Sequence, residues 1–129
     1  MKKIISLLLI SISIFTLACE RDTTYDNFTQ CLADSGTIFY GAFWCPHCQS
    51  QKELFGDSDD LLPYVECDAN GKDANPAACT AAGVKTYPTW VFPDGNIETG
   101  TKSLKQLGEW SSCPLPGEES ILVAPSTED

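Results

Sequence analysis

In the first half of the chain, continuous apolar runs alternate with segments whose apolar residues recur at helical spacing. Residues 37–43 form a near-continuous apolar run rich in β-forming residues, which is typical of a central strand buried on both faces. Apolar positions at helical spacing predict a helix over residues 26–34 and another over residues 46–55. Residues 61–67 predict a second strand, so this half follows the order helix, strand, helix, strand.

The second half predicts a further helix, a hairpin and a last helix. Asn75 precedes a proline and opens a short alanine-rich helix. Residues 84–92 and the Asp-Gly turn at 94–95 predict a β-hairpin, and Ser103 begins the last helix. This order of elements favours an α/β fold in one domain, with a mixed central sheet flanked by helices.

The two ends of the chain differ from this domain. Residues 1–18 combine a short basic start with an uncharged apolar run, which predicts a signal peptide. Residues 16–19 resemble a bacterial lipobox, so Cys19 is the expected lipidation site; the alternatives are an ordinary signal cleaved near Ala18, or an uncleaved anchor. Residues 19–25 are expected to form a polar tether.

The domain itself is expected to span residues 26–113. The acidic, proline-rich residues 114–129 predict a disordered tail. We expect an exported protein on the periplasmic side of a bacterial membrane, anchored through Cys19. Disulfides persist in such a compartment.

The charge narrows the classes of ligand. The formal net charge is −10, and loss of residues 1–18 would leave 6 basic against 18 acidic residues. Such a surface excludes nucleic acid and anionic membrane faces as expected ligands. The simpler interpretation of the acidity is that it keeps the domain soluble.

The strongest chemical signal is the sequence Cys45-Pro46-His47-Cys48, directly after the central strand. Pro46 is suited to the first position of a helix, so Cys45 would lie at a helix N-terminus, where backbone N–H groups favour a thiolate. Cys48, one turn later, could attack a mixed disulfide formed at Cys45. The alternative is half of a zinc site, whose other ligands would have to be cysteines, because His47 is the only histidine in the chain.

The remaining cysteines suggest structural disulfides. Setting Cys19 aside leaves six cysteines, two of which belong to the motif. Cys67 and Cys79 flank a short polar loop, and Cys31 and Cys113 lie in the first and last predicted helices. We expect the pairs Cys67–Cys79 and Cys31–Cys113. Six cysteines allow 15 pairings, and either pair could instead be a second redox couple.

A family resemblance adds to this interpretation. A strand–CxxC–helix unit followed by X-Pro before a hairpin resembles the thioredoxin fold, over residues 25–113. More narrowly, residues 39–48, 51–56, 64–67 and 87–90 are similar to the thioredoxin-like domain of bacterial vitamin K epoxide reductase homologues. In that family the domain is fused to, or partners with, a quinone-linked membrane enzyme and shuttles disulfides to exported proteins.

The resemblance implies roles for individual residues. Cys45 would be the nucleophile and Cys48 the resolving thiol. Pro88 would be a cis-proline facing the active site, and the main chain of Tyr87 would pair with a bound substrate. The alternative is a trans-proline at the start of a strand.

The chain also departs from the thioredoxin pattern at two places. Thioredoxins carry a buried acid six residues before the first cysteine of the motif, where this chain has Phe39. Deprotonation of Cys48 must therefore rely on another group or on water. The dipeptide Pro46-His47 matches the periplasmic oxidase DsbA, and His47 could stabilise the Cys45 thiolate, making the disulfide more oxidising. The alternative for His47 is an exposed spacer.

Together these features predict an exported thiol–disulfide oxidoreductase that is an oxidase rather than a reductase. Its partners would be exported proteins with cysteines and a quinone-linked membrane thiol oxidoreductase. No cofactor or metal is expected, and monomer is the default. The alternatives are a tethered reductant or isomerase, and a disulfide-stapled or metal-binding lipoprotein. An apolar rim for unfolded chains could be formed by Phe43, Trp44, Tyr87 and Trp90; the alternative is that these strand aromatics belong to the core.

Overall fold

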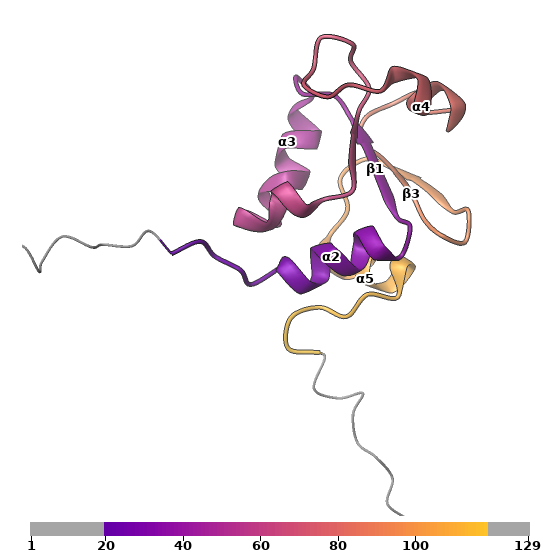
Figure 1. Cartoon of the computed structure of the whole chain (residues 1–129). Helices are drawn as coiled ribbons and strands as arrows, with labels where there is room; N and C mark the ends of the chain where they lie inside the picture. Colours follow the sequence, from indigo (N-terminus) through magenta and orange to yellow (C-terminus); the bar gives the residue numbers. More distant parts are fainter. Residues whose placement is uncertain (1–19, 119–129) are drawn as a thin grey trace, which may run out of the picture.

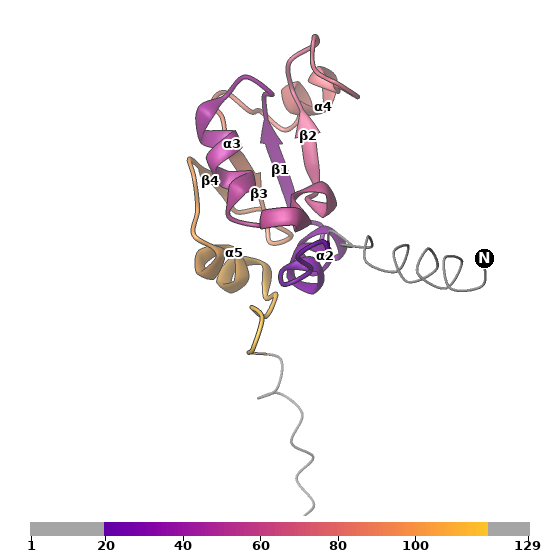
Figure 2. The same cartoon turned by 90° about the vertical axis from the view of Figure 1, so that its left-hand side faces the viewer.

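A mixed four-stranded sheet organises the computed structural model, which describes residues 20–118 (Figures 1 and 2). The strand order is β2–β1–β3–β4, with β1 parallel to β2 and antiparallel to β3. β4 completes a hairpin with β3. The bounds are β1 (Ile38–Gly41), β2 (Tyr64–Glu66), β3 (Thr89–Val91) and β4 (Ile97–Thr99).

Helices lie on both sides of the sheet and at one end of it. In Figures 1 and 2, α3 covers one face, α4 lies on the other side, and α2 and α5 lie together at the lower end. This is a thioredoxin-like α/β fold, as the sequence predicts. The bounds are α2 (Asp26–Asp34), α3 (Pro46–Glu53), the 3-10 helix η1 (Gly56–Leu61), α4 (Pro76–Ala81) and α5 (Leu104–Ser111).

The register of the sheet determines which residues face α3. Phe39 lies beside Tyr64 of β2 and Trp90 of β3, and its ring stacks on that of Trp90 with centroids 4.5 Å apart. Because side chains alternate along a strand, Gly41 and its register partner Glu66 lie on the same face as Phe39. This face therefore carries the aromatic core and, at its upper end, a glycine next to an acid.

Two predicted elements have different bounds in the structure. The strand predicted over residues 61–67 is limited to Tyr64–Glu66, because the residues before Leu62 form η1. Pro63 precedes the strand and has no N–H to give to a ladder. The helix predicted to reach residue 55 ends at Glu53, and Leu54, directly after it, is 40% exposed.

The segment predicted as a tether lies against the domain. Arg21 donates two hydrogen bonds to the carbonyl of Asp57, at 2.9 and 3.1 Å, and pairs with the carboxylates of Asp26 and Asp60. Tyr25 packs against the core. The packed part of the chain thus begins before residue 26.

The packed part also extends past residue 113. Leu115 packs against the core, and its N–H donates to the carboxylate of Glu118. The predicted signal peptide, the expected lipidation site Cys19 and most of the predicted tail lie outside the described residues. No helix within residues 20–118 is both long enough and apolar enough to cross a membrane.

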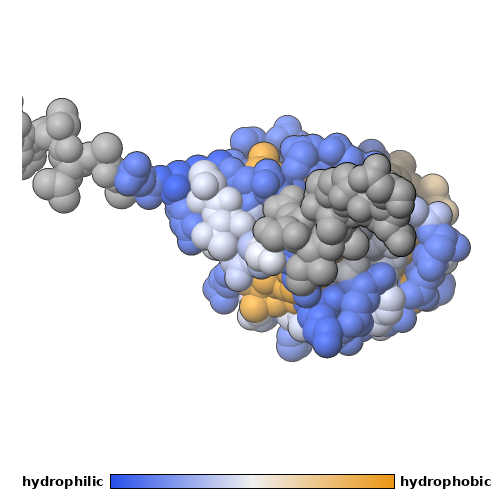
Figure 3. Space-filling model, turned by 90° about the horizontal axis from the view of Figure 1, so that it is seen from below, coloured by the Kyte–Doolittle hydropathy of each residue, from blue (hydrophilic) through white to orange (hydrophobic). Residues whose placement is uncertain are grey.

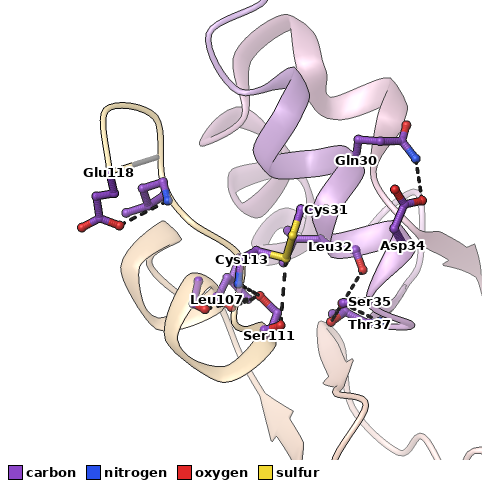
Figure 4. The surroundings of a disulfide bond; sticks show 12 residues. Gln30, Cys31, Leu32, Asp34, Ser35, Thr37, Leu107, Ser111, Cys113 and Glu118 are labelled. Carbon is purple, nitrogen blue, oxygen red and sulfur yellow. Dashed lines mark hydrogen bonds between the residues drawn. A yellow bond between two sulfur atoms is a disulfide. The ribbon is translucent and has the colours of Figure 1, made fainter. Parts of the chain in front are cut away.

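Two disulfides join distant parts of this frame. Cys31 of α2 is bonded to Cys113, just after α5, so the first and last described helices are linked (Figure 4). Cys67, after β2, is bonded to Cys79 of α4. A domain of this size buries a modest core, so such links contribute a large share of its stability.

We expect the first disulfide to stabilise the domain more than the second. The Cys31–Cys113 bond spans 82 residues and the Cys67–Cys79 bond 12, which corresponds to about 4–5 against about 3 kcal/mol in the chain-entropy model. Replacing Cys31 and Cys113 by alanine should therefore lower the free energy of unfolding more than replacing Cys67 and Cys79 by alanine. Urea unfolding of the two double variants measures it, and the reverse order would contradict the expectation.

Candidate active site

Cys45 is placed by the end of β1 and the start of α3. Its N–H donates to the carbonyl of Ala42 at 2.9 Å, in a tight turn just after the strand. Cys45 has extended backbone angles (φ −78°, ψ 115°) and occupies the N-cap position, and Pro46 follows in the first turn. The apolar strand and the proline together thus place Cys45 at a helix N-terminus, and Figure 2 shows the connection from β1 to α3.

The sulfur of Cys45 is bound by the start of its own helix. Sγ accepts a hydrogen bond from the N–H of Cys48 at 3.3 Å. A donor of this kind, together with the helix dipole, stabilises a thiolate. Cys45 is only 5% exposed, although its position predicts an exposed thiol. The residue is therefore largely covered by its surroundings.

Cys48 is the more deeply placed of the two free thiols, with 1% exposure. Burial raises the pKa of Cys48 to about 12, helped by the hydrogen bond and the charge of Cys45; the backbone of Ala42 and the charge of Lys52 act in the opposite direction. Cys48 is therefore a neutral thiol near pH 7. The geometry suits Cys45 to attack and Cys48 to resolve.

His47 is exposed on the outer side of α3. Its carbonyl accepts a hydrogen bond from the hydroxyl of Thr101 at 3.4 Å. Within residues 20–118, the hydrogen bond to the Cys45 sulfur comes from the backbone of Cys48 and not from the imidazole. A contribution of His47 to the thiolate would therefore have to act through its charge.

The loop before β3 meets the motif. The Tyr87–Pro88 peptide bond is cis, and Pro88 is buried. Tyr87 packs against the core cluster that contains Cys45 and Cys48, and its ring lies edge-on to Trp44, with centroids 6.1 Å apart. Tyr87 is thus in contact with Trp44, the residue directly before the motif.

The apolar rim differs in one member from the prediction. Phe43 and Trp44 are 52% and 55% exposed beside the motif. Trp90, which was expected at the rim, is fully buried in the core because its register places it beneath α3, against Phe39. The exposed rim is therefore formed by Phe43 and Trp44, with Tyr87 half-buried next to them.

Trp44 is held in place by a hydrogen bond to an acidic loop. Its indole N–H donates to the carboxylate of Asp68 at 2.7 Å. The backbone N–H of Asn70, followed by Trp44 and the Asn70 side chain, lowers the pKa of Asp68, so this acceptor stays charged. The ring is thus both exposed and fixed in orientation.

A polar group that the sequence analysis missed lies next to Cys48. A Cβ atom built on Gly41 would lie 2.9 Å from Cys48 Sγ and 3.3 Å from the hydroxyl oxygen of Tyr64. That hydroxyl donates to the carboxylate of Glu66 at 2.8 Å, and the Lys52 ammonium lies 3.6 Å from the centre of the Tyr64 ring. The sequence carries no direct signal for this group, because it depends on the register that pairs Gly41 with Glu66 across β1 and β2.

A metal centre has no support in the described structure. Among residues 20–118, no group of three or more His, Cys, Asp or Glu side chains is placed to hold an ion. Four of the described cysteines are already in disulfides. The two cysteines of the motif, Cys45 and Cys48, are free thiols.

Comparison with known proteins points to the same chemistry. The chain is similar to a thiol-disulfide oxidoreductase. This relative, LTO1 of Arabidopsis thaliana, is 38% identical over 84 residues, which make up 62% of this chain and 22% of the relative. The chain thus spans about a fifth of the relative's length. No protein-family model matches the chain.

The difference between the two thiols predicts selective labelling. In the reduced protein at neutral pH, iodoacetamide should modify Cys45 well before Cys48, because the raised pKa keeps Cys48 protonated and its burial limits access. Labelling of Cys48 should increase only as the pH rises toward 12 or when the protein unfolds. Peptide mass spectrometry over time measures both. Equal labelling of both thiols at neutral pH would contradict this assignment.

Proposed function

We propose that this chain is an exported thiol–disulfide oxidoreductase that exchanges disulfides with exported proteins through Cys45 and Cys48. The observation that carries the proposal is the free thiol pair itself: one sulfur accepts a backbone hydrogen bond at the N-terminus of α3, and the other is buried one turn later. The similarity to a named thiol-disulfide oxidoreductase supports it. The whole relative is much longer, so only the exchange chemistry is carried over.

The proposed direction is oxidation of client thiols. Stabilising the Cys45 thiolate stabilises the reduced form of the pair, which makes the disulfide the stronger oxidant. The hydrogen bond from Cys48 N–H and the helix N-terminus act in this sense, and the charge of a protonated His47 would add to it. The Cys31–Cys113 and Cys67–Cys79 disulfides fit a compartment in which disulfides persist.

The client surface is proposed to be the rim around the motif. Phe43 and Trp44 expose apolar area next to Cys45, and the main chain at Tyr87 borders the same site. At the opposite end of the domain, the surface that Figure 3 leaves uncovered is hydrophilic with some hydrophobic areas. Unfolded chains with apolar segments would therefore favour the motif end.

The cellular setting of the proposal comes from the sequence. The basic and apolar start of the chain supports export, and Cys19 in its lipobox-like context supports a lipid anchor on the periplasmic side of a bacterial membrane. A quinone-linked membrane enzyme of the vitamin K epoxide reductase type is the proposed partner that reoxidises the pair. Protein thiols suffice for the exchange, and no cofactor is required.

The reduction potential of the Cys45–Cys48 pair tests the direction. We expect a value of about −120 to −180 mV, the range of DsbA and protein disulfide isomerase, since the thiolate is stabilised. Equilibration with glutathione, followed by alkylation and mass measurement, gives the potential. A value near about −270 mV would instead support a tethered reductant. A pair that never equilibrates would contradict exchange itself.

Shortening the rim should impair protein clients more than small disulfides. Replacing both Phe43 and Trp44 by alanine removes exposed apolar area but leaves both thiols in place. We expect oxidation of a reduced, unfolded protein to slow by about 10-fold, because about 1–2 kcal/mol of client binding is lost. The rate with oxidised glutathione should stay within about twofold, as measured by thiol alkylation.

A matched control for this variant lies on β4. Ile97 is 54% exposed, so Ile97→Ala removes a similarly exposed apolar side chain from another part of the surface. We expect its rates to match those of the wild type with both kinds of substrate. Equal slowing in the control and the rim variant would show that the rim has no special role in client binding.

A further inference from the structure

The proposed exchange requires a proton acceptor for Cys48. The thiol must ionise before it can attack a mixed disulfide at Cys45, and burial opposes that ionisation, raising the pKa of Cys48 to about 12. Bulk water has little access to a sulfur whose residue is 1% exposed. At neutral pH, therefore, an acceptor within the protein would speed resolution greatly.

The acceptor must lie on the face of the sheet that packs against α3. Phe39 lies on this face and carries no titratable group. Gly41 follows on the same face, and because it has no side chain, Cys48 and Tyr64 approach the same small volume. Sγ of Cys48 and the hydroxyl oxygen of Tyr64 lie 2.9 and 3.3 Å from the position that a Gly41 Cβ would take.

The Tyr64 hydroxyl leads directly to a buried acid. It donates to one carboxylate oxygen of Glu66 at 2.8 Å, and the other oxygen accepts from the N–H of Asp68, also at 2.8 Å. Glu66 is only 5% exposed. Burial, followed by the hydrogen bond to Glu66 and its charge, raises the pKa of Tyr64, so the phenol stays protonated and can pass on a proton only as it receives one.

A polar cavity connects this group to the solvent. It has a volume of about 340 Å³, and Tyr64 and Glu66 are among its lining residues. The other charged residues in the lining come from α3, η1 and the loop after β2, and they are Lys52, Asp59, Asp60, Lys72 and Asp73. Water in the cavity can therefore take up or supply a proton at Glu66.

We propose that Tyr64 and Glu66 form a proton relay for Cys48 that opens into this cavity; the inference rests on the proposed exchange. Cys48 gives its proton, directly or across one water molecule, to the Tyr64 hydroxyl as Tyr64 gives its own to the Glu66 carboxylate. The Cys48 thiolate then forms a bond to Cys45 Sγ, and the bond from Cys45 to the client sulfur breaks. The pair of thiols is oxidised, the client sulfur leaves reduced as a thiolate, and Glu66 releases the proton to water.

The same relay runs backwards when the pair donates its disulfide. A client thiolate bonds to Cys45, the Cys45–Cys48 bond breaks, and the electron pair stays on Cys48. The proton then passes from the cavity through Glu66 and Tyr64 to the Cys48 sulfur. The groups that face this path are Cys45 and Lys52 from α3, besides the charged residues of the cavity lining.

A single-turnover reaction separates this step from the first attack. Reduced protein is mixed with an excess of an aromatic disulfide whose released thiolate is coloured. Attack by Cys45 releases one thiolate at a rate that depends on the reagent concentration. Resolution by Cys48 releases a second coloured thiolate, at a rate that is independent of the reagent concentration. A Cys48→Ser variant can release only the first thiolate, so it identifies the first phase.

Glu66→Gln and Tyr64→Phe test the relay. The amide still offers an oxygen to Tyr64 but cannot take up a proton, and phenylalanine keeps the ring beneath the Lys52 ammonium. Near pH 7 we expect the second phase to slow by about 10- to 100-fold in both variants, while the first phase changes by less than about twofold. The difference in second-phase rate between the variants and the wild type should shrink as the pH rises toward the pKa of Cys48, because the thiol then ionises without an acceptor.

Glu109→Gln is the matched control, because it removes the same charge from an exposed position on α5. It should leave both phases unchanged, and thermal unfolding of every variant shows whether it is folded. Unchanged second phases in both relay variants would overturn the relay, as would an equal slowing of both phases at all pH values. If the wild type shows neither phase, the proposed exchange itself fails, and the relay with it.

Discussion

The close approach of α3 to β1 at Gly41 is the contact on which the site depends. The Cys48 sulfur lies only 2.9 Å from the position that a Cβ atom at Gly41 would take. A larger residue would push α3 away from the sheet or turn the thiol aside. The approach buries Cys48, and that burial makes the two thiols unequal. Cys45 is suited to attack, whereas Cys48 must first lose its proton to an acceptor.

The location of the thiol pair could be predicted from the sequence because its signals are local. An apolar strand, a proline at the first helical position and two cysteines one turn apart each act within a few residues. The same holds for the helix starts at Asn75 and Ser103, whose side chains cap their own helices. These local signals, together with the turn at 94–95, were enough for the fold class as well.

What could not be predicted depends on register and packing. Trp90 looks like its neighbours in the sequence, but pairing with Phe39 places it in the core. The position of Glu66 next to Gly41 depends on where β2 begins, and the prediction started that strand too early because η1 has no strong sequence signal. The contact between Tyr87 and Trp44 likewise joins residues that are distant in sequence.

The contacts of Arg21 determine where the start of the described chain lies relative to the thiol pair. They hold the start of the described chain against η1, at the end of the sheet opposite to the N-terminus of α3 (Figure 2). The described chain therefore begins at the rear of the domain. The thiol pair lies at the other end of the sheet, so the proposed clients could reach it without being obstructed by residues 20–25.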